Sequence, residues 1–450
     1  MTHLKVVSAD GRGGRRRIER LAARGREVLD RKTVRAARRI VEAVRKEGDR
    51  ALLEHVRRLD GHDAASVAEL ELTRGAHVAG PPTPEGLPEG FAEALETAIH
   101  AVERYHRPQV REGYRLEEDG VVLEELRTPL ARVGIYVPGG RAAYPSTVVM
   151  TAVPARLAGV RELVVATPPG PYRANPALRY ALHRLRIGEV WGMGGAHAVA
   201  ALAYGTETVR RVDKIVGPGN AWVTAAKSLV AADVGIDSLA GPSEVVIVAG
   251  GPFGSHGPNE VADRLAADLL AQAEHDPRAA AVLVTDDPKL ARRTAKRVEA
   301  RRADLATAET AAASLRRFGV ALVVPSMAEA AALVRRLAPE HLQLVGEAAE
   351  ALAGDGAPPF PAGAVFLGSS TPEVFGDYVT GPSHVLPTCG TARFASALGV
   401  EDFVRRSHRV RVSPEAAREL APVAAALARV EGLPAHRASA LLRGPGRRGE

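Results

Sequence analysis

From about residue 131, the chain repeats a short β-branched run that ends near a glycine and is followed by an alanine-rich helical segment. This alternation is typical of βαβ units, in which helices join parallel strands and cover the sheet. Strands are expected at 133–137, 163–167, 190–193, 214–216 and 245–248, and a second series at 282–285, 320–324 and 365–367. Apolar spacing predicts helices at 260–274, 288–301 and 327–337. The pattern indicates an α/β protein with two Rossmann-like parallel-sheet domains.

The regions on either side of these domains are predicted to be helical. Apolar residues recur at helical spacing in 27–59 and 91–105. We therefore expect a helical N-terminal region at 1–130, partly packed into the second α/β domain. The first α/β domain is placed at 131–244 and the second at 245–386. The strand signals end after Pro387, so 387–450 is predicted to be an extended helical tail.

The predicted tail has very little core of its own. Its expected helices lie at 394–398, 401–405, 414–430 and 434–442. A segment that buries so little apolar surface is not stable alone. The tail must therefore pack on the main body or reach a second subunit.

The charge balance bears on nucleic-acid binding. The chain has 60 basic and 53 acidic residues, a net charge of +7, and arginine is dense between residues 12 and 39. This positive charge suggests one alternative, an arginine-rich nucleic-acid-binding protein. Only 4% of the residues are aromatic, and the arginines lie at helical spacing among Ala and Glu. We expect solvated helix surfaces and no nucleic-acid partner.

The composition also restricts the compartment and the kind of metal site. The first residues contain no apolar signal segment, and no apolar stretch approaches the roughly 18 residues of a membrane span. A cytoplasmic protein with no membrane partner is expected. A single cysteine, Cys389, excludes an intramolecular disulfide and a thiolate-rich metal site. Any metal must be held by His, carboxylate or amide groups.

Three glycine-rich turns follow predicted strands. The first spans 134–140, and the segment 144–147 after it is expected to cap a helix that begins near Val148. Two others start a G-x-G pattern at Gly192 and Gly217, but His197 and Trp222 stand where the third glycine of the dinucleotide fingerprint belongs. Each turn is either an ordinary tight turn or a cofactor contact.

Side chains suited to metal binding and proton transfer are scattered through the last 180 or so residues. Gln272 and His275 are three apart on a predicted helix and project from one face. Imidazoles with one carboxylate suit Zn²⁺, and a Gln oxygen is an uncommon ligand. Each residue alone is more simply a solvent-exposed side chain. The set is Gln272, His275, Asp377, His384, Glu431 and His436.

The pair Glu340-His341 follows the predicted helix that ends at Leu337. In a turn, the two side chains can face one pocket and offer bases of different strength. The alternative is a structural histidine near the helix C-terminus, where the dipole favours a cation.

Nine ordered motifs resemble those of the histidinol dehydrogenase family over nearly the whole chain. They are VGIYVPGG, YPSTVVM, VDKIVGPGN, AGPSEV, DLLAQAEHD, APEHLQL, AGAVFLG, GDYVTGPSHVLPT and EGLPAH. The resemblance implies an enzyme of histidine biosynthesis that oxidises L-histidinol through L-histidinal to L-histidine. It implies one Zn²⁺ per subunit, two NAD⁺ used in turn, and a homodimer with shared active sites.

The resemblance also implies roles for matched positions. His341 corresponds to the base that takes the alcohol proton, and Glu340 to the residue that activates water for the second oxidation. The NAD⁺ contacts correspond to Tyr136, His197 and Asn220. The zinc ligands correspond to Gln272, His275, Asp377 and His436. The substrate contacts include these four ligands together with Ser243, His341 and Glu431. His384 is expected to line the same pocket, and the C-terminal tail to carry Glu431 and His436 to the partner's site.

Two positions depart from the family pattern, and one related activity competes. His197 replaces the usual Gln at a cofactor position, and Ser383 stands where Asn is common before His384. The rival is a paralogous zinc- and NAD-dependent alcohol dehydrogenase, such as one that oxidises a sulfonated propanediol. Ser243 and Glu431 favour histidinol, because an anionic substrate would require Arg or Lys where Glu431 lies.

Overall fold

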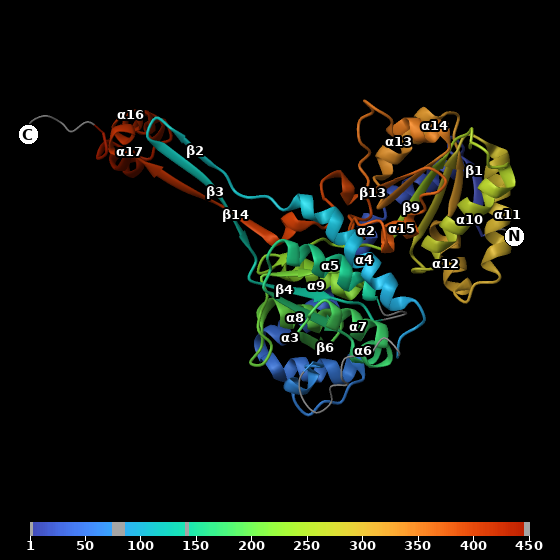
Figure 1. Ribbon diagram of the computed structural model, residues 1–450, viewed down its shortest axis with the longest axis horizontal. Coiled ribbons are helices and arrows are strands. Elements are labelled where there is room, and N and C mark those ends of the chain that lie inside the picture. Colours follow the sequence, from blue (N-terminus) through green and yellow to red (C-terminus); the bar gives the residue numbers. More distant parts are fainter. Residues whose placement is uncertain (1–2, 74–85, 140–143, 445–450) are drawn as a thin grey trace, which may run out of the picture.

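The structure is a computed structural model that describes residues 3–73, 86–139 and 144–444. Two parallel sheets form the main body, and a long antiparallel ribbon projects from it (Figure 1). Gly140 of the predicted glycine turn and the last six residues of the tail lie outside the described ranges. No helix in those ranges is long and apolar enough to cross a membrane.

The smaller sheet has five parallel strands in the order β6-β5-β4-β7-β8. All four strands predicted for this region are present, because their β-branched residues are buried on both faces of the sheet. Its strands are β4 (Arg132–Tyr136), β5 (Glu162–Thr167), β6 (Glu189–Gly192), β7 (Lys214–Val216) and β8 (Gly235–Ile236). Its helices are α5 (Pro145–Leu157), α6 (Pro169–Ala174), α7 (Pro176–Arg184), α8 (Gly195–Tyr204) and α9 (Ala221–Val230).

Chain order reverses within this sheet between β4 and β7, so the carboxyl ends of those two strands form its topological switch point. Open α/β sheets bind nucleotides at such switch points. Helix α5 begins at Pro145 and not near Val148, and its N-cap residue Tyr144 makes no capping side-chain hydrogen bond. Proline is favoured at this first helical position because its missing N–H has no helical partner there.

The larger sheet has six parallel strands in the order β1-β11-β10-β9-β12-β13. The predicted strands of the second series are all present, while β1 and β12 were not predicted. Its strands are β1 (Lys5–Ser8), β9 (Glu244–Ala249), β10 (Ala280–Thr285), β11 (Val320–Val323), β12 (His341–Val345) and β13 (Ala364–Leu367). Its helices are α1 (Arg12–Ala22), α10 (Pro258–Ala273), α11 (Pro288–Arg302), α12 (Ala308–Phe318), α13 (Met327–Leu337), α14 (Glu347–Glu350) and α15 (Glu373–Tyr378).

The N-terminal region is not wholly helical. Strand β1 pairs with β11 at the edge of the larger sheet, and β2 (Arg115–Glu118) and β3 (Val121–Pro129) form part of the ribbon. Helix α3 (Arg31–His55) packs on α8 and α9 of the smaller domain. It bends at Gly48, whose φ of 53° lies in the region that glycine tolerates best. Helix α4 (Phe91–His106) packs on α5, and the short α2 is Gly25–Val28.

The C-terminal tail contains a long strand, so the prediction of a wholly helical tail is wrong. Strand β14 (Val404–Val412) pairs antiparallel with β3 along its full length. Of the helix expected at 401–405, residues 401–403 lie in a short 3₁₀ helix, Val400–Phe403, and 404–405 begin β14. No helix covers 394–398. A 3₁₀ turn at Thr391–Arg393 lies just before this segment. Most residues of β14, with the sequence VRRSHRVRV, are exposed. The strand therefore does not show the alternation of apolar and polar residues that marks a half-buried strand.

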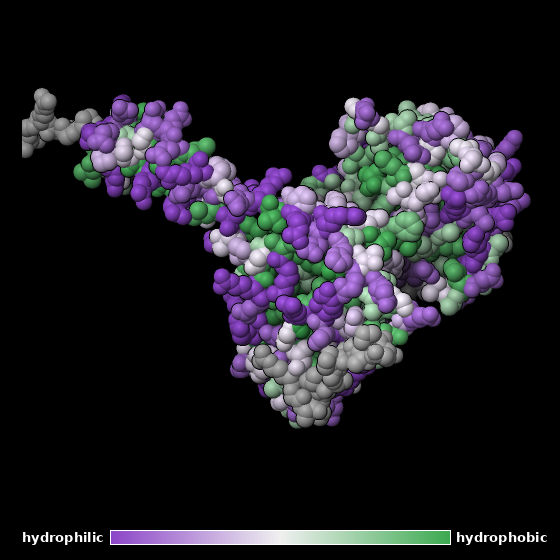
Figure 2. All heavy atoms as spheres, viewed as in Figure 1, coloured by the Kyte–Doolittle hydropathy of each residue, from purple (hydrophilic) through white to green (hydrophobic). Residues whose placement is uncertain are grey.

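Helices α16 (Pro414–Val430) and α17 (Pro434–Leu441) pack on each other at the far end of the ribbon. We call the ribbon and these two helices the arm (Figure 1). The arm leaves large apolar side chains in solvent, with Leu427 at 63% and Val430 at 89% exposure. Green apolar atoms accordingly lie among the purple ones at its outer end (Figure 2). Exposed apolar surface of this kind marks an interaction site.

Candidate active site

The predicted bases Glu340 and His341 lie at the amino edge of the larger sheet. His341 is the first residue of β12 and pairs in register with Val245 of the neighbouring β9. Helix α13 has already ended, because Ala338 adopts a left-handed φ of 48°. His341 is therefore not the helix-terminal histidine of the alternative reading. Both side chains are 5% exposed, so the pair is buried.

Glu244, the first residue of β9, contacts both predicted bases through its main chain. Its N–H donates to Oε2 of Glu340 at 2.9 Å, and its carbonyl oxygen lies 3.2 Å from Nδ1 of His341. The main-chain N–H of Glu340 donates in return to Oε1 of Glu244 at 3.3 Å. Because a carbonyl oxygen only accepts, His341 must carry its proton on Nδ1 to make this bond. Its Nε2 is then the atom with a free lone pair.

The side chain of Glu244 is held from behind by Arg24. One guanidinium nitrogen of Arg24 donates to Oε2 of Glu244, and the other donates to the carbonyl oxygens of Pro242 at 3.0 Å and Arg278 at 2.9 Å. Cys389 donates its main-chain N–H to Oε1 at 2.9 Å. Sequence reasoning missed Arg24 and Glu244, because their pairing joins residues 220 positions apart.

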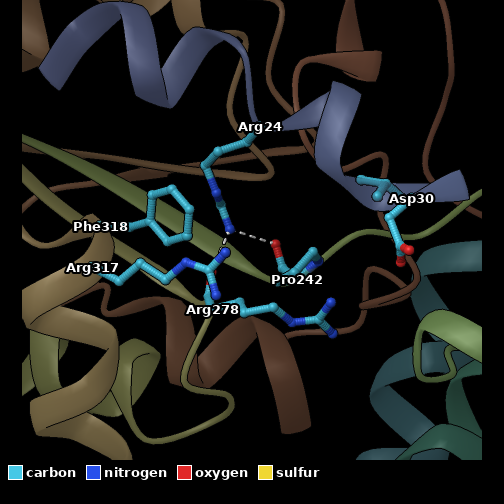
Figure 3. A pocket seen from close by; sticks show the side chains of 7 residues that line it. Arg24, Asp30, Pro242, Arg278, Arg317 and Phe318 are labelled. Atoms are coloured by element: carbon cyan, nitrogen blue, oxygen red, sulfur yellow. Dashed lines mark hydrogen bonds between the residues drawn. The ribbon is translucent and has the colours of Figure 1, made fainter. Parts of the chain in front are cut away.

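A pocket of about 380 Å³ opens beside Arg24 (Figure 3). It contains none of the predicted site residues. Its walls include Arg24, Arg278 and Phe318, and the guanidinium of Arg24 lies 4.9 Å from the centre of the Phe318 ring. Glu244, Glu340 and His341 do not line this pocket.

Two acidic residues of α15 face His341. Nδ1 of His341 lies 3.7 Å from Oε2 of Glu373, and Nε2 lies 4.0 Å from Oδ1 of Asp377. Sequence reasoning missed Glu373, which is 2% exposed. A signal was present, because Glu373 and Asp377 are four apart and share one face of the short helix.

Burial shifts the pKa of every titratable group in this cluster towards its neutral form. It raises the pKa of Glu340 and of Glu373 well above the usual value, and it raises that of Asp377 to about 7. It lowers the pKa of His341 to about 3 and that of His384 to about 4. Both imidazoles are therefore neutral at pH 7, the form that accepts a proton or binds a metal.

The predicted ligand Gln272 lies in the last turn of α10, while His275 lies in the turn just after this helix and not on its face as expected. Helix α10 contacts α15, which carries Asp377. Gln272 is fully buried, and neither polar atom of its side chain has a hydrogen-bond partner among the described residues. A buried amide without partners is unfavourable unless something else fills the place. His275 keeps an exposed surface, although the surrounding protein lowers its pKa.

Glu431 and His436 lie apart from this cluster. Glu431 ends α16 and His436 lies on α17, so both belong to the arm, and both are exposed. In the described part of the chain, no three His, Cys, Asp or Glu side chains gather closely enough to hold a metal ion. The predicted ligands in the body of the chain are an amide, an imidazole and a carboxyl group, the first and last on the contacting helices α10 and α15. Those donor types fit zinc.

The three predicted NAD⁺ contacts lie at the carboxyl edge of the smaller sheet. The hydroxyl oxygen of Tyr136 accepts from the N–H of Gly195 at 3.0 Å, and burial raises its pKa to about 12. His197 is 1% exposed, and its Nε2 lies 2.8 Å from Oδ2 of Asp60. Asn220 is exposed, and its side-chain oxygen caps α9. Only Asn220 presents an open surface, and its amide nitrogen is the group left for a ligand.

Three further residues take definite positions. Ser243 precedes Glu244, and its carbonyl oxygen accepts from the N–H of Ala280 at 3.0 Å. The ring of His384 is held by Nδ1 at 3.1 Å from the carbonyl oxygen of Asp377. The departure at Ser383 is buried, and its hydroxyl donates to the carbonyl oxygen of Met150 at 3.0 Å. Ser383 therefore supports the loop that places His384.

Comparisons with known proteins agree over nearly the full length. A sequence model described as histidinol dehydrogenase matches residues 24–444. Histidinol dehydrogenase of Synechococcus sp. is 46% identical over 91% of each chain, and that of Rhizobium meliloti is 45% identical over 90% of this chain and 91% of that one. The crystal structure of histidinol dehydrogenase from Elizabethkingia anophelis, 28% identical, superimposes with a TM-score of 0.84 over 98% of both chains. The chain belongs to the histidinol dehydrogenase family.

Proposed function

We propose that this chain is a zinc-dependent, NAD⁺-linked histidinol dehydrogenase that converts L-histidinol through L-histidinal to L-histidine. The observation that supports this best is the buried pair Glu340-His341, fixed by the main chain of Glu244, together with a fully buried Gln272 whose amide has no partner among the described residues. The overall change removes two hydrides from the substrate and adds one water. The site must therefore supply both a proton acceptor and a group that activates water.

Gln272, His275 and Asp377 would hold the zinc ion together with His436 of a second copy of the chain. When bound, zinc would supply a Lewis acid that orients the amino alcohol, and NAD⁺ would supply the hydride acceptor. The Gln272 amide, which is buried without partners, would then gain one. Side chains of the chain itself would carry out the proton transfers.

His341 is the proposed acceptor of the alcohol proton. The bond from Nδ1 to Glu244 fixes the ring and leaves Nε2 to accept. A pKa near 3 makes this imidazole a weak base in the isolated chain, because it is buried among groups that are neutral. A carboxylate brought close, such as Glu431 on a partner's arm, would raise that pKa by favouring the imidazolium.

Glu340 is the proposed group that activates water for the second oxidation. Its Oε2 is fixed by the N–H of Glu244, and its raised pKa makes the carboxylate a stronger base than an exposed one. The aldehyde must gain water before a second hydride can leave. In its carboxylate form Glu340 takes the proton of that water, and the burial of this side chain limits access of bulk solvent to the site.

The arm supports a shared site in a homodimer. It places the last predicted ligand and the last predicted substrate contact on a projection that carries exposed apolar residues. Burial of Leu427 and Val430 against a second copy would stabilise the pair by about 1.5–3 kcal/mol for each side chain. Each arm then completes the partner's cluster, and the dimer carries two sites.

The rival substrate class is a sulfonated diol. The described site residues place carboxyl groups and neutral imidazoles around His341, and the arm adds Glu431. The acidic side chain that the arm adds would repel an anionic substrate and suits one with an amino group and an imidazole. This contribution of the arm supports histidinol over the sulfonate.

The test is a stoichiometric assay of NADH formed from L-histidinol. Two NADH per histidinol, lost on chelation and regained with zinc, would support the proposal. A sulfonated propanediol assayed in parallel separates the rival, since turnover of that diol without turnover of histidinol would overturn the assignment. NADH formation that persists after complete removal of metal would refute the zinc requirement alone.

A further inference from the structure

Two strand-to-helix turns of the smaller sheet are each held by one buried carboxyl group. The first turn follows β6 and leads into α8, and the second follows β7 and leads into α9. The carboxyl groups are Asp60, at the end of the turn that follows α3, and Asp237, just after β8. Neither residue was singled out by the sequence motifs.

Asp237 holds the second turn with Lys227. Its Oδ2 accepts from the N–H of Gly217 at 2.7 Å, and its Oδ1 accepts from Nζ of Lys227 at 2.6 Å. The same ammonium group donates to the carbonyl oxygen of Gly217 at 2.6 Å. The side chains of this ion pair are only 3% and 4% exposed. The N–H and the carbonyl oxygen of Gly217 are thus each bonded to a charged side chain.

Asp60 holds the first turn with His197. Its Oδ2 accepts from the N–H of Gly194 at 2.9 Å and lies 2.8 Å from Nε2 of His197. The next N–H, that of Gly195, donates to the hydroxyl oxygen of Tyr136. The two turns therefore share one arrangement, in which an aspartate joins a glycine N–H to a basic side chain of the following helix.

These hydrogen bonds determine whether the glycine N–H groups can bind a ligand. In a dinucleotide-binding turn, glycine N–H groups point at the phosphates. Here the N–H groups of Gly194, Gly195 and Gly217 already donate within the protein. Gly217 is also packed tightly, because a Cβ there would lie 2.3 Å from the carbonyl oxygen of Tyr136. The bonds fix the shape of each turn and leave ligand contacts to the residues that follow.

The second turn is also joined to the catalytic edge of the larger sheet. Asn220 lies three residues after Gly217 and begins α9. The hydroxyl of Thr224 on α9 donates to the carbonyl oxygen of Ala240 at 2.8 Å, on the segment that runs from Asp237 to Ser243. Displacement of Asp237 would therefore move Asn220 and would be transmitted towards Ser243.

We propose that the ion pair of Lys227 and Asp237 is a positioning device for the nicotinamide cofactor, and that Asp60 acts in the same way on the neighbouring turn. A buried ion pair is weak evidence for stability, because desolvation offsets its attraction. The pair instead specifies a geometry, because each of its two side chains bonds the other and also bonds the main chain of Gly217. The inference rests on the proposed NAD⁺-linked function.

The test compares Lys227→Met and Asp60→Asn with a matched control in the same domain, using the zinc-loaded full-length enzyme. Arg132→Met is the control, because Arg132 is 5% exposed and pairs with Glu162 at 2.8 Å and Glu189 at 2.6 Å at the opposite, amino edge of the sheet. We expect the Kd of NAD⁺, measured by titration calorimetry, and its KM to rise on the order of tenfold in both cofactor-side variants, since loss of a bond to a charged group changes binding by that factor. The KM for histidinol and the zinc content should stay at wild-type values.

A double variant distinguishes a positioning role of the ion pair from general damage to the fold. In Lys227→Met with Asp237→Asn, the amide oxygen still accepts the Gly217 N–H and no unpaired charge is buried, so the KM for NAD⁺ should return towards wild type. An equal KM change in Arg132→Met, or a KM for NAD⁺ unchanged in Lys227→Met and Asp60→Asn, would overturn the inference while the proposed function stands. A wild-type enzyme that neither binds nor reduces NAD⁺ would overturn both. If Lys227→Met does not fold, Asp60→Asn alone decides between these outcomes.

Discussion

Nε2 of His341 lies 4.0 Å from Oδ1 of Asp377, so the free lone pair of the proposed base faces a proposed metal ligand. The burial that raises the pKa of Asp377 to about 7 makes this carboxyl group prefer a proton when no cation is present. Metal and proton therefore compete for Asp377 near neutral pH. The competition gives this side chain opposite effects on stability in the metal-free and the metal-loaded enzyme.

Asp377→Asn is expected to stabilise the metal-free enzyme increasingly as the pH rises. The folded pKa of about 7 lies above the unfolded value of 3.8, so the folded state binds the extra proton and loses stability as pH increases between those values. At pH 8 the variant should exceed wild type in free energy of unfolding by up to roughly 4 kcal/mol. Urea titrations with chelator at pH 4 and pH 8 measure the difference.

Zinc should reverse this order, because Asn is a poorer ligand than carboxylate. Wild type should gain more than the variant in Tm when zinc is added at pH 8. A difference in unfolding free energy that is the same at both pH values would show that Asp377 does not titrate in this window.

Substitution of the two bases should affect different steps. His341→Ala is expected to lower the rate with histidinol by about a hundredfold or more, since it removes the proposed proton acceptor. Glu340→Gln should spare the first oxidation and lower the second by a similar factor. Assays that start from histidinol and from histidinal, with trapping of released aldehyde, separate the two steps. Equal loss of both steps in Glu340→Gln would contradict this division of labour.

Two inactive variants should restore activity when combined. His341→Ala damages the cluster in the body, while His436→Ala removes the ligand on the arm. In a mixed dimer, one site receives both changes and the other receives neither, so a random mixture should recover about one quarter of wild-type activity. The measurement is NADH formation after the two chains are expressed together.

Combination of His341→Ala with Gln272→Ala provides the matched control, since both residues lie in the body of one chain. That mixture should stay inactive. Recovery there, or no recovery in the first mixture, would rule out a site shared through the arm.

Arg24→Met should destabilise the protein strongly. Its removal leaves the buried Glu244 carboxyl group without its cation, and the loss of one partner from a buried pair costs about 3–5 kcal/mol. Addition of Glu244→Gln should recover part of this, because the amide removes the unpaired charge. Guanidinium denaturation of the three variants measures the coupling. Additive losses in the double variant would indicate that the two side chains do not depend on each other.

The alternation of strand and helix predicted most of the body, because buried β-branched runs and helix spacing are local signals. Strand β12 escaped this reasoning, since HLQLV is too short and too mixed to show a period. Strand β14 was not predicted for a different reason. Arg405, Arg406 and Arg411 give it a polar surface, and its partner β3 lies about 280 residues away in the sequence, as in the register of Arg405 with Thr128.

The candidate site could be predicted only in part from single positions. Gln272, His275 and Asp377 are individually unremarkable, and the resemblance of the surrounding motifs assigned them. Glu373 and Arg24 have no such assignment, and their importance depends on contacts with His341 and Glu244 that no local pattern encodes. The zinc, NAD⁺ and dimer assignments remain predictions.

The side chains of both proposed bases contact the main chain of Glu244, whose own side chain bonds this pair only by accepting from the main-chain N–H of Glu340. Every amino acid provides the same carbonyl oxygen, and every one except proline provides the same N–H. A point mutation at position 244 can thus disturb the pairing with Arg24 yet cannot delete either contact, unless it introduces proline. The positions of the two bases therefore depend little on which amino acid occupies position 244.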